Sequence, residues 1–282
     1  MISKKMIIVT LLLILFSCSK DNEIIIDDEN IQGKNMLLIG NSFFRPYAEK
    51  LDIIATDAGL ENHNSTIVMR GGPNGEPISF WNNSTSAEHQ LIKSVLDQGN
   101  IDYFGMTYGN AQDNVQGYVN WIAYALQNNP NIRIFISIPP IDFPNDWEQL
   151  SQNYGFNSIQ EFYEYFVDDI VHQNLVNHLR TQFPDTNIFT IPTGWATINL
   201  AQMQKDDLLL DDILLFGPRE TSIFTDNKGH QGEIVRETGG LIWLNSIYNI
   251  NLNTNNYITG FNSDLHTLAR QITDNHNPNY RQ

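Results

Sequence analysis

Short runs of apolar residues alternate with longer segments of helical period along this chain. Five runs rich in Ile, Val and Phe have the length of buried strands, at 36–39, 66–69, 101–106, 132–138 and 187–191. Five other segments carry apolar residues at helical spacing, at 47–58, 88–96, 115–126, 159–182 and 234–247. This alternation indicates βαβ units with right-handed crossovers. We therefore expect an α/β fold, a three-layer α/β/α sandwich whose central parallel sheet has about five strands.

The first 18 residues have the pattern of an export signal. Two lysines precede an apolar run at 6–16, which is too short to span a bilayer and has the length of a signal-peptide core. The string at 15–18, Leu-Phe-Ser-Cys, resembles a bacterial lipobox. The resemblance implies cleavage before Cys18 and attachment of lipid to its thiol. The alternatives are a cleaved signal peptide with an incidental cysteine and an uncleaved anchor.

The residues that follow Cys18 divide into a tether and a domain. Residues 19–34 are mostly polar and acidic, and they begin with a string that looks like the export tether of Bacteroidetes-type lipoproteins. We expect residues 35–282 to form one domain, since they contain no internal repeat. The chain is thus predicted to be an outer-membrane lipoprotein of the cell envelope, on the periplasmic face or the cell surface.

Charge and cysteine content narrow the chemistry that this domain can perform. The net charge of −16 repels phosphate backbones and anionic headgroups, so no nucleic-acid partner is expected, and membrane contact is expected only through the lipid. Cys18 is the single cysteine. Its lipidation would leave the domain without a disulfide, a thiol nucleophile or a cysteine-ligated metal. The histidines show no metal-ligand spacing, and we expect neither a metal nor another cofactor.

A candidate nucleophile follows the first predicted strand. Gly40 allows a tight exit from this strand, and Ser42 then stands where the next helix begins. At that place a hydroxyl faces the crevice beyond the sheet, and unpaired backbone N–H groups favour developing negative charge. Taken alone, the string also fits a serine that caps the helix.

The string Gly-Asn-Ser-Phe at 40–43 resembles the first sequence block of the SGNH (GDSL-type) hydrolases. This resemblance implies a flavodoxin-like fold with Ser42 as the nucleophile and its own N–H in the oxyanion hole. The second block of the family is a glycine after the second strand, which is Gly72 here or its neighbour Gly71. The alternative for both glycines is an ordinary turn.

The third and fourth blocks are matched with departures. Asn110 follows the third strand as the oxyanion amide, without the family's next Asp, and Asn114 competes with it. The last block, usually Asp-x-x-His, has one extra residue between Asp226 and His230. The resemblance implies that His230 is the general base and that Asp226 holds its tautomer.

The resemblance implies a serine esterase, and an acidic lipoprotein of this kind resembles esterases that remove acetyl groups from polysaccharides. The expected partner is an acylated carbohydrate or another small ester. Phe43, Phe44, Trp81 and Tyr108 are candidates for stacking on sugar rings, with core packing as the alternative for each. The competing functions are a catalytically inactive glycan-binding lipoprotein and a lipase or thioesterase of the same fold.

Overall fold

The computed structural model describes residues 32–110 and 114–282. One parallel sheet contains five strands in the flavodoxin-like order β2-β1-β3-β4-β5. The strands are β1 (Asn35–Gly40), β2 (Asn64–Met69), β3 (Tyr103–Thr107), β4 (Arg133–Ser137) and β5 (Ile188–Ile191). The predicted fold class is confirmed. Cys18, the predicted signal peptide and most of the predicted tether lie outside the described residues.

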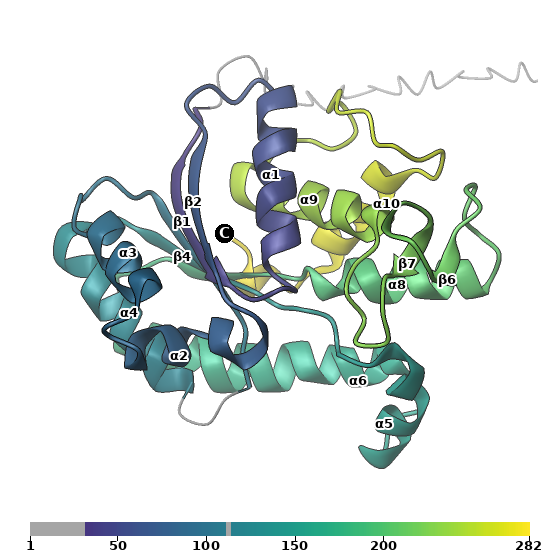
Figure 1. The fold of residues 1–282 in the computed structure, drawn as a ribbon, viewed down its shortest axis with the longest axis horizontal. Coiled ribbons are helices and arrows are strands. Elements are labelled where there is room, and N and C mark those ends of the chain that lie inside the picture. Colours follow the sequence, from purple (N-terminus) through teal and green to yellow (C-terminus); the bar gives the residue numbers. More distant parts are fainter. Residues whose placement is uncertain (1–31, 111–113) are drawn as a thin grey trace, which may run out of the picture.

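Helices cover both faces of the sheet. Helices α1, α8, α9 and α10 form one layer, and α2, α3, α4, α6 and α7 lie on the other side (Figure 1). The helices are α1 (Arg45–Asp57), α2 (Pro77–Asn82), α3 (Ala87–Leu96), α4 (Asn114–Asn128), α5 (Trp147–Asn153), α6 (Ile159–Tyr165), α7 (Asn177–Gln182), α8 (Gly194–Lys205), α9 (Glu233–Tyr248) and α10 (Leu265–Asn275). The shorter elements are the 3-10 turns η2 (Gly72–Gly75), η3 (Pro144–Asp146), η5 (Arg219–Thr221) and η6 (Pro278–Tyr280), the π-helical segment η4 (Phe166–Val176), and the strand pair β6 (Leu214–Phe216) and β7 (Ser222–Phe224).

Burial explains why the strands form where the apolar runs predict them. The interior strands β1, β3 and β4 are buried almost along their whole length, because helices cover both of their faces. The edge strand β2 is partly exposed, as its mixed sequence Asn-Ser-Thr-Ile-Val-Met allows. The predicted helix at 159–182 is present but changes its winding, since η4 separates α6 from α7. Helices α2, α5, α8 and α10 and the short strands β6 and β7 were not predicted.

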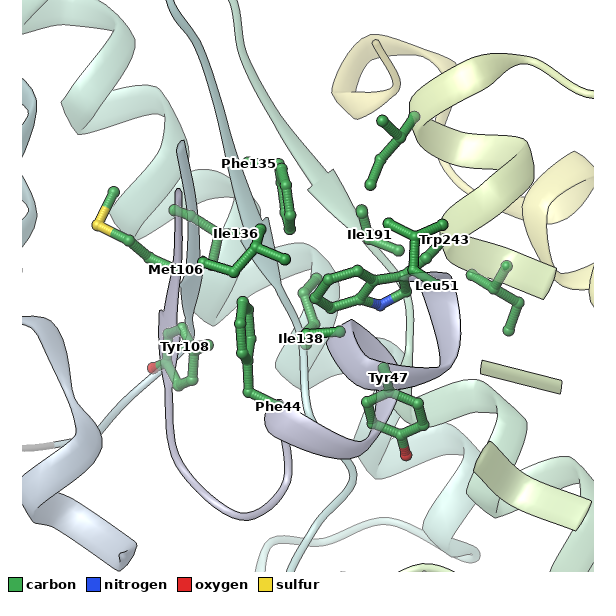
Figure 2. Packing of buried hydrophobic residues seen from close by; sticks show 14 of the residues in the cluster. Phe44, Tyr47, Leu51, Met106, Tyr108, Phe135, Ile136, Ile138, Ile191 and Trp243 are labelled. Carbon is green, nitrogen blue, oxygen red and sulfur yellow. The ribbon is translucent and has the colours of Figure 1, made fainter. Parts of the chain in front are cut away.

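An aromatic cluster ties the end of the first strand to the last long helix. Trp243 of α9 packs edge-on against Phe44, with ring centroids 5.0 Å apart, and against Phe135 of β4 at 5.2 Å (Figure 2). Its indole N–H donates to Thr193 Oγ1 at 2.9 Å, so the buried donor is satisfied. Phe44 stands two residues after Ser42, and the loop before α9 carries His230. The cluster therefore fixes both segments relative to the sheet.

A buried ion pair joins α1 to α9 beside this cluster. Lys50 is only 6% exposed and donates to Glu233 at 2.6 Å and to Glu237 at 3.0 Å. Burial lowers the pKa of Lys50, but the bonds to the two carboxylates outweigh this and leave its pKa raised. Removing Lys50 would leave the buried Glu237 carboxylate without its counter-charge, and breaking a buried ion pair in this way typically costs about 3–5 kcal/mol. The two helices that flank the site are thus held in one relative position.

Candidate active site

The turn between β1 and α1 presents Ser42 at the carboxyl edge of the sheet. Asn41 builds this turn, because its side-chain oxygen accepts from Phe43 N at 3.0 Å and its carbonyl accepts from Arg45 N at 3.0 Å. The Ser42 hydroxyl lies 2.8 Å from Nε2 of His230, and α1 has no side-chain cap. The structure therefore does not use this serine as a helix cap.

The loop that follows β7 carries the two other predicted triad residues. Asp226 Oδ2 accepts a hydrogen bond from His230 Nδ1 at 2.6 Å, which leaves Nε2 directed at Ser42. The other oxygen, Oδ1, accepts from the backbone N–H groups of Lys228, Gly229 and His230 at 3.0–3.2 Å. Gly229 has φ +97°, a conformation that glycine adopts without strain. This turn accommodates the extra residue between the acid and the histidine.

The environment keeps the Asp226 carboxyl ionised. Partial burial raises its pKa, but hydrogen bonds from the His230 ring and from backbone amides outweigh burial and hold the pKa below the ordinary value. Phe43 stacks on the His230 ring at 5.0 Å with an angle of 16° between the ring planes. The imidazole is therefore fixed by a carboxylate on one edge and by an aromatic ring on one face.

A second carboxylate lies near the loop, but it contacts a different partner. Asp142 Oδ2 is 3.7 Å from Nζ of Lys228, and Lys228 in turn lies over the Phe43 ring. Burial raises the pKa of Asp142, while the charges of Lys228 and His230 lower it. Asp226, which contacts His230 directly, is the better candidate for the acid.

Both predicted oxyanion residues line one cleft of about 410 Å³ that begins beside Ser42, at Asn41 and Phe43. Gly72 is the first residue of η2, where a helix leaves its N–H without an intrahelical partner. Asn110, also in the lining, is exposed, and its backbone N–H donates to Glu76 at 3.3 Å. The alternative Gly71 is not among the lining residues.

The competing asparagine is engaged elsewhere. Asn114 is buried, its amide NH2 donates to the carbonyl of Gly109 at 2.7 Å, and its side-chain oxygen accepts from Ile78 N at 3.2 Å. This side chain joins α4 to α2, so it holds backbone together instead of facing the cleft beside Phe43. Of the two candidates, Asn110 lines the cleft beside Phe43 and Asn114 does not.

The four candidate aromatic residues divide into two groups. Phe43 and Tyr108 line the cleft beside Ser42. Phe44 is buried under Trp243, and Trp81 packs edge-on against Trp121 with ring centroids 4.8 Å apart. Core packing, the alternative given for each, therefore accounts for the buried Phe44 and for the partly buried Trp81.

Two residues of this region were missed in the sequence. Phe143 is 50% exposed at the rim of the cleft and has φ +56°, a strained value for a bulky residue. Its N–H donates to the carbonyl of Lys228 at 3.0 Å, so the strained loop is tied to the loop of His230. Gly75 packs on the end of β1, where a Cβ would lie 2.5 Å from the Gly40 carbonyl. The third glycine of Gly71-Gly72-Pro-Asn-Gly75 was the available signal for Gly75.

In residues 32–110 and 114–282, no group of three or more His, Cys, Asp or Glu side chains is arranged to hold a metal ion. No helix in these ranges has both the length and the apolar character needed to cross a bilayer.

Comparisons with known proteins support the fold of this chain and identify no family. No protein-family model matches the chain. No curated protein matches it. A DUF4886 family protein from Bacteroides uniformis has a similar structure, with a TM-score of 0.58 and 15% identity over 86% of this chain and 93% of that chain. The periplasmic domain of a lipopolysaccharide acetyltransferase from Salmonella ser. Paratyphi A gives a TM-score of 0.38 at 11% identity, over 76% of this chain and 82% of that chain. The first similarity supports the fold, and the second is too low to support an argument.

Proposed function

We propose that this protein is a serine esterase of the SGNH type that hydrolyses ester bonds, and that it removes acetyl groups from carbohydrate. The observation that carries the proposal is the chain of hydrogen bonds from Ser42 to His230 at 2.8 Å and from His230 to Asp226 at 2.6 Å. A hydroxyl, an imidazole and an ionised carboxylate in this order are the three groups of a Ser-His-Asp triad, which activates a serine as a nucleophile.

In the proposed mechanism, Ser42 attacks the ester carbonyl while Nε2 of His230 takes the hydroxyl proton. The carboxylate of Asp226 stabilises the imidazolium that forms. The N–H groups of Ser42 and Gly72 and the Asn110 amide donate to the negative oxygen of the tetrahedral intermediate. When this intermediate collapses, His230 returns the proton to the leaving alcohol. Water then attacks the acyl-serine with His230 as base, which releases the carboxylic acid and restores the hydroxyl.

The cleft beside Ser42 has the size and the lining to take part of an acylated polysaccharide. Its volume of about 410 Å³ is within the range of small-ligand sites, and it is lined by aromatic rings together with amide and carboxyl groups. The ring of Phe143 is 50% exposed and offers an apolar face on which a neighbouring sugar of a polysaccharide would stack. The lipobox at 15–18 would place this activity at the cell envelope.

The experiment that tests the proposal is labelling with a fluorophosphonate. This reagent forms a covalent bond from phosphorus to an activated serine oxygen and releases fluoride. We expect one adduct on Ser42, measured by mass spectrometry of tryptic peptides, and hydrolysis of 4-nitrophenyl acetate that the adduct blocks. Ser42→Ala should abolish both signals, whereas the exposed Ser94→Ala should retain them.

The outcome that favours the competing function is equally clear. Folded wild-type protein that neither reacts with the phosphonate nor hydrolyses any acetyl ester would refute the esterase and favour the catalytically inactive glycan-binding lipoprotein. Ser42→Ala should also keep its free energy of unfolding within about 1–2 kcal/mol of wild type, the range for one lost hydrogen bond.

A further inference from the structure

A second cleft begins at Ser42 and His230 and extends away from the predicted oxyanion residues. Its volume is about 390 Å³, and three arginines line it: Arg45, Arg219 and Arg236. They come from the start of α1, from η5 and from α9. A chain with a net charge of −16 thus places three guanidinium groups beside its candidate nucleophile.

The carboxylates near this cleft do not neutralise all three arginines. Glu49 is the one acidic residue in the lining, and it accepts from Arg45 Nε at 2.5 Å. Arg236 makes only longer contacts, to Glu49 at 3.5 Å and to Glu233 at 3.3 Å, and its buried Nε has no hydrogen-bond partner in the described chain.

Arg219 is exposed and forms no ion pair with a carboxylate of residues 32–110 and 114–282. Its guanidinium is consequently available to an outside anion. Arg45 uses Nε for Glu49, and its side chain is 49% exposed, so the end of its guanidinium group also faces solvent. A guanidinium matches the two oxygens of a carboxylate with two parallel N–H donors.

The mechanism decides which half of an ester enters this cleft. The group that protonates the leaving alcohol is Nε2 of His230, so the alcohol oxygen must lie on the His230 side of Ser42. His230 lines the arginine cleft, whereas Gly72 and Asn110 line the other cleft, beyond Asn41 and Phe43. With the oxyanion on the glycine side, the alcohol part of the ester extends towards the arginines.

We propose that the substrate is an ester whose alcohol part carries a carboxylate, of the class of an acetylated acidic sugar, and that Arg219 and Arg45 bind this carboxylate. The proposal rests on the proposed esterase function and adds the charge of the substrate. Arg236 also packs between α1 and α9, so Arg219, which has no ion-pair partner in the described part of the chain, is the residue to test.

The test compares two matched substrates, the monoacetyl esters of glucuronate and of glucose, which differ by a carboxylate. Wild-type protein should have the higher kcat/KM for the acetylated glucuronate. Arg219→Gln should lower the ratio of the two kcat/KM values by about 10-fold to 100-fold, the loss expected for a charge-assisted hydrogen bond. The ratio for Arg219→Lys should lie between those of wild type and Arg219→Gln. Arg270→Gln, in a surface pair with Asp274 on α10, should leave the ratio unchanged.

A binding measurement separates this inference from the esterase itself. Calorimetry with Ser42→Ala and acetylated glucuronate reports binding without turnover, and we expect the second substitution Arg219→Gln to weaken it by a similar factor. Hydrolysis that depends on Ser42 but does not favour the acidic ester would overturn the inference and leave the esterase standing. Binding that depends on Arg219, without any hydrolysis by the wild-type protein, would support the anion site and refute the esterase function. Equal binding of glucose 6-sulfate would overturn the choice of a carboxylate.

Discussion

Asparagine at position 226 would change the charge beside His230 while keeping the shape of the side chain. The carbonyl oxygen of asparagine can still accept from the backbone N–H groups of Lys228, Gly229 and His230, as Oδ1 of Asp226 does. The loop should therefore keep its form. The difference falls on the second atom, where an oxygen that accepts from His230 Nδ1 at 2.6 Å becomes an NH2 group that donates.

The reversed hydrogen bond has a direct consequence for proton transfer. Nδ1 of His230 would become the acceptor, so the ring proton would move to Nε2. Nε2 then donates to the Ser42 oxygen at 2.8 Å and cannot take the serine proton. The imidazolium would also lose its neighbouring negative charge. We expect kcat to fall by up to about four orders of magnitude, the loss that a misplaced imidazole proton causes in triad enzymes. This factor corresponds to a rise of about 5.5 kcal/mol in the activation free energy.

The assay is kcat/KM for 4-nitrophenyl acetate at several pH values, together with urea unfolding. The Asp226 side chain is 48% exposed, so the free energy of unfolding should fall by only about 1 kcal/mol at pH 7. Because the pKa of Asp226 is lowered in the folded state, this contribution is present above the ordinary pKa of a carboxyl and is lost as the pH falls below it.

Asp142→Asn is the matched control, because Asp142 is a nearby carboxylate that pairs with Lys228 instead of His230. It should change kcat/KM by less than about threefold, since it removes no bond from the histidine and surface ion pairs contribute little. A folded Asp226→Asn protein that keeps more than a tenth of wild-type activity would refute the reasoning. If Asp142→Asn were the damaging change, Asp142 would be the acid.

Three further predictions concern other parts of the chain. Burial lowers the pKa of His172 from 6.5 to about 4, so the unfolded chain binds the proton more readily than the folded protein does. The free energy of unfolding should therefore fall by up to about 3 kcal/mol as the pH drops from 6.5 to 4, and urea titrations should show a shallower decline for His172→Asn. Gly75→Ala should destabilise the protein by about 1–3 kcal/mol, because its Cβ would collide with the Gly40 carbonyl, whereas Gly71→Ala, with open space, should be nearly neutral in thermal unfolding. Cys18→Ser should release the protein from the outer-membrane fraction or block its processing without changing specific activity; wild-type protein in the culture supernatant with a free thiol would contradict the lipobox.

The aromatic residues show which properties local sequence predicts and which depend on tertiary packing. Phe43 and Phe44 are adjacent and chemically identical, yet Phe43 stacks on His230 and Phe44 packs under Trp243. Nothing in the local string separates them, because the turn of the chain at Asn41 decides which ring faces the core. Trp81 was likewise open to either interpretation until Trp121 was found against it.

Missed helices have two different explanations. The apolar residues of α10 recur at 265, 268, 269 and 272, a helical spacing that was present in the sequence and was overlooked. In contrast, α8 is buried around much of its circumference, so its sequence has little amphipathic contrast. The three segments α6, η4 and α7 were predicted as one helix, because the buried residues of η4 recur every four to five positions, which is close to α-helical spacing.

The sequence by itself determined the five strands of the parallel sheet, the class of fold and the loops in which Ser42, Asp226 and His230 stand. Burial imposes a local period on apolar residues, and polar groups that follow buried strands collect at one edge of a parallel sheet. Tertiary structure alone decided that residues 188 positions apart form a 2.8 Å hydrogen bond, that Ile78 and Gly109 engage Asn114, and that three distant arginines share one cleft. These relations depend on how separate helices pack on the sheet, and no local pattern of residues encodes that packing.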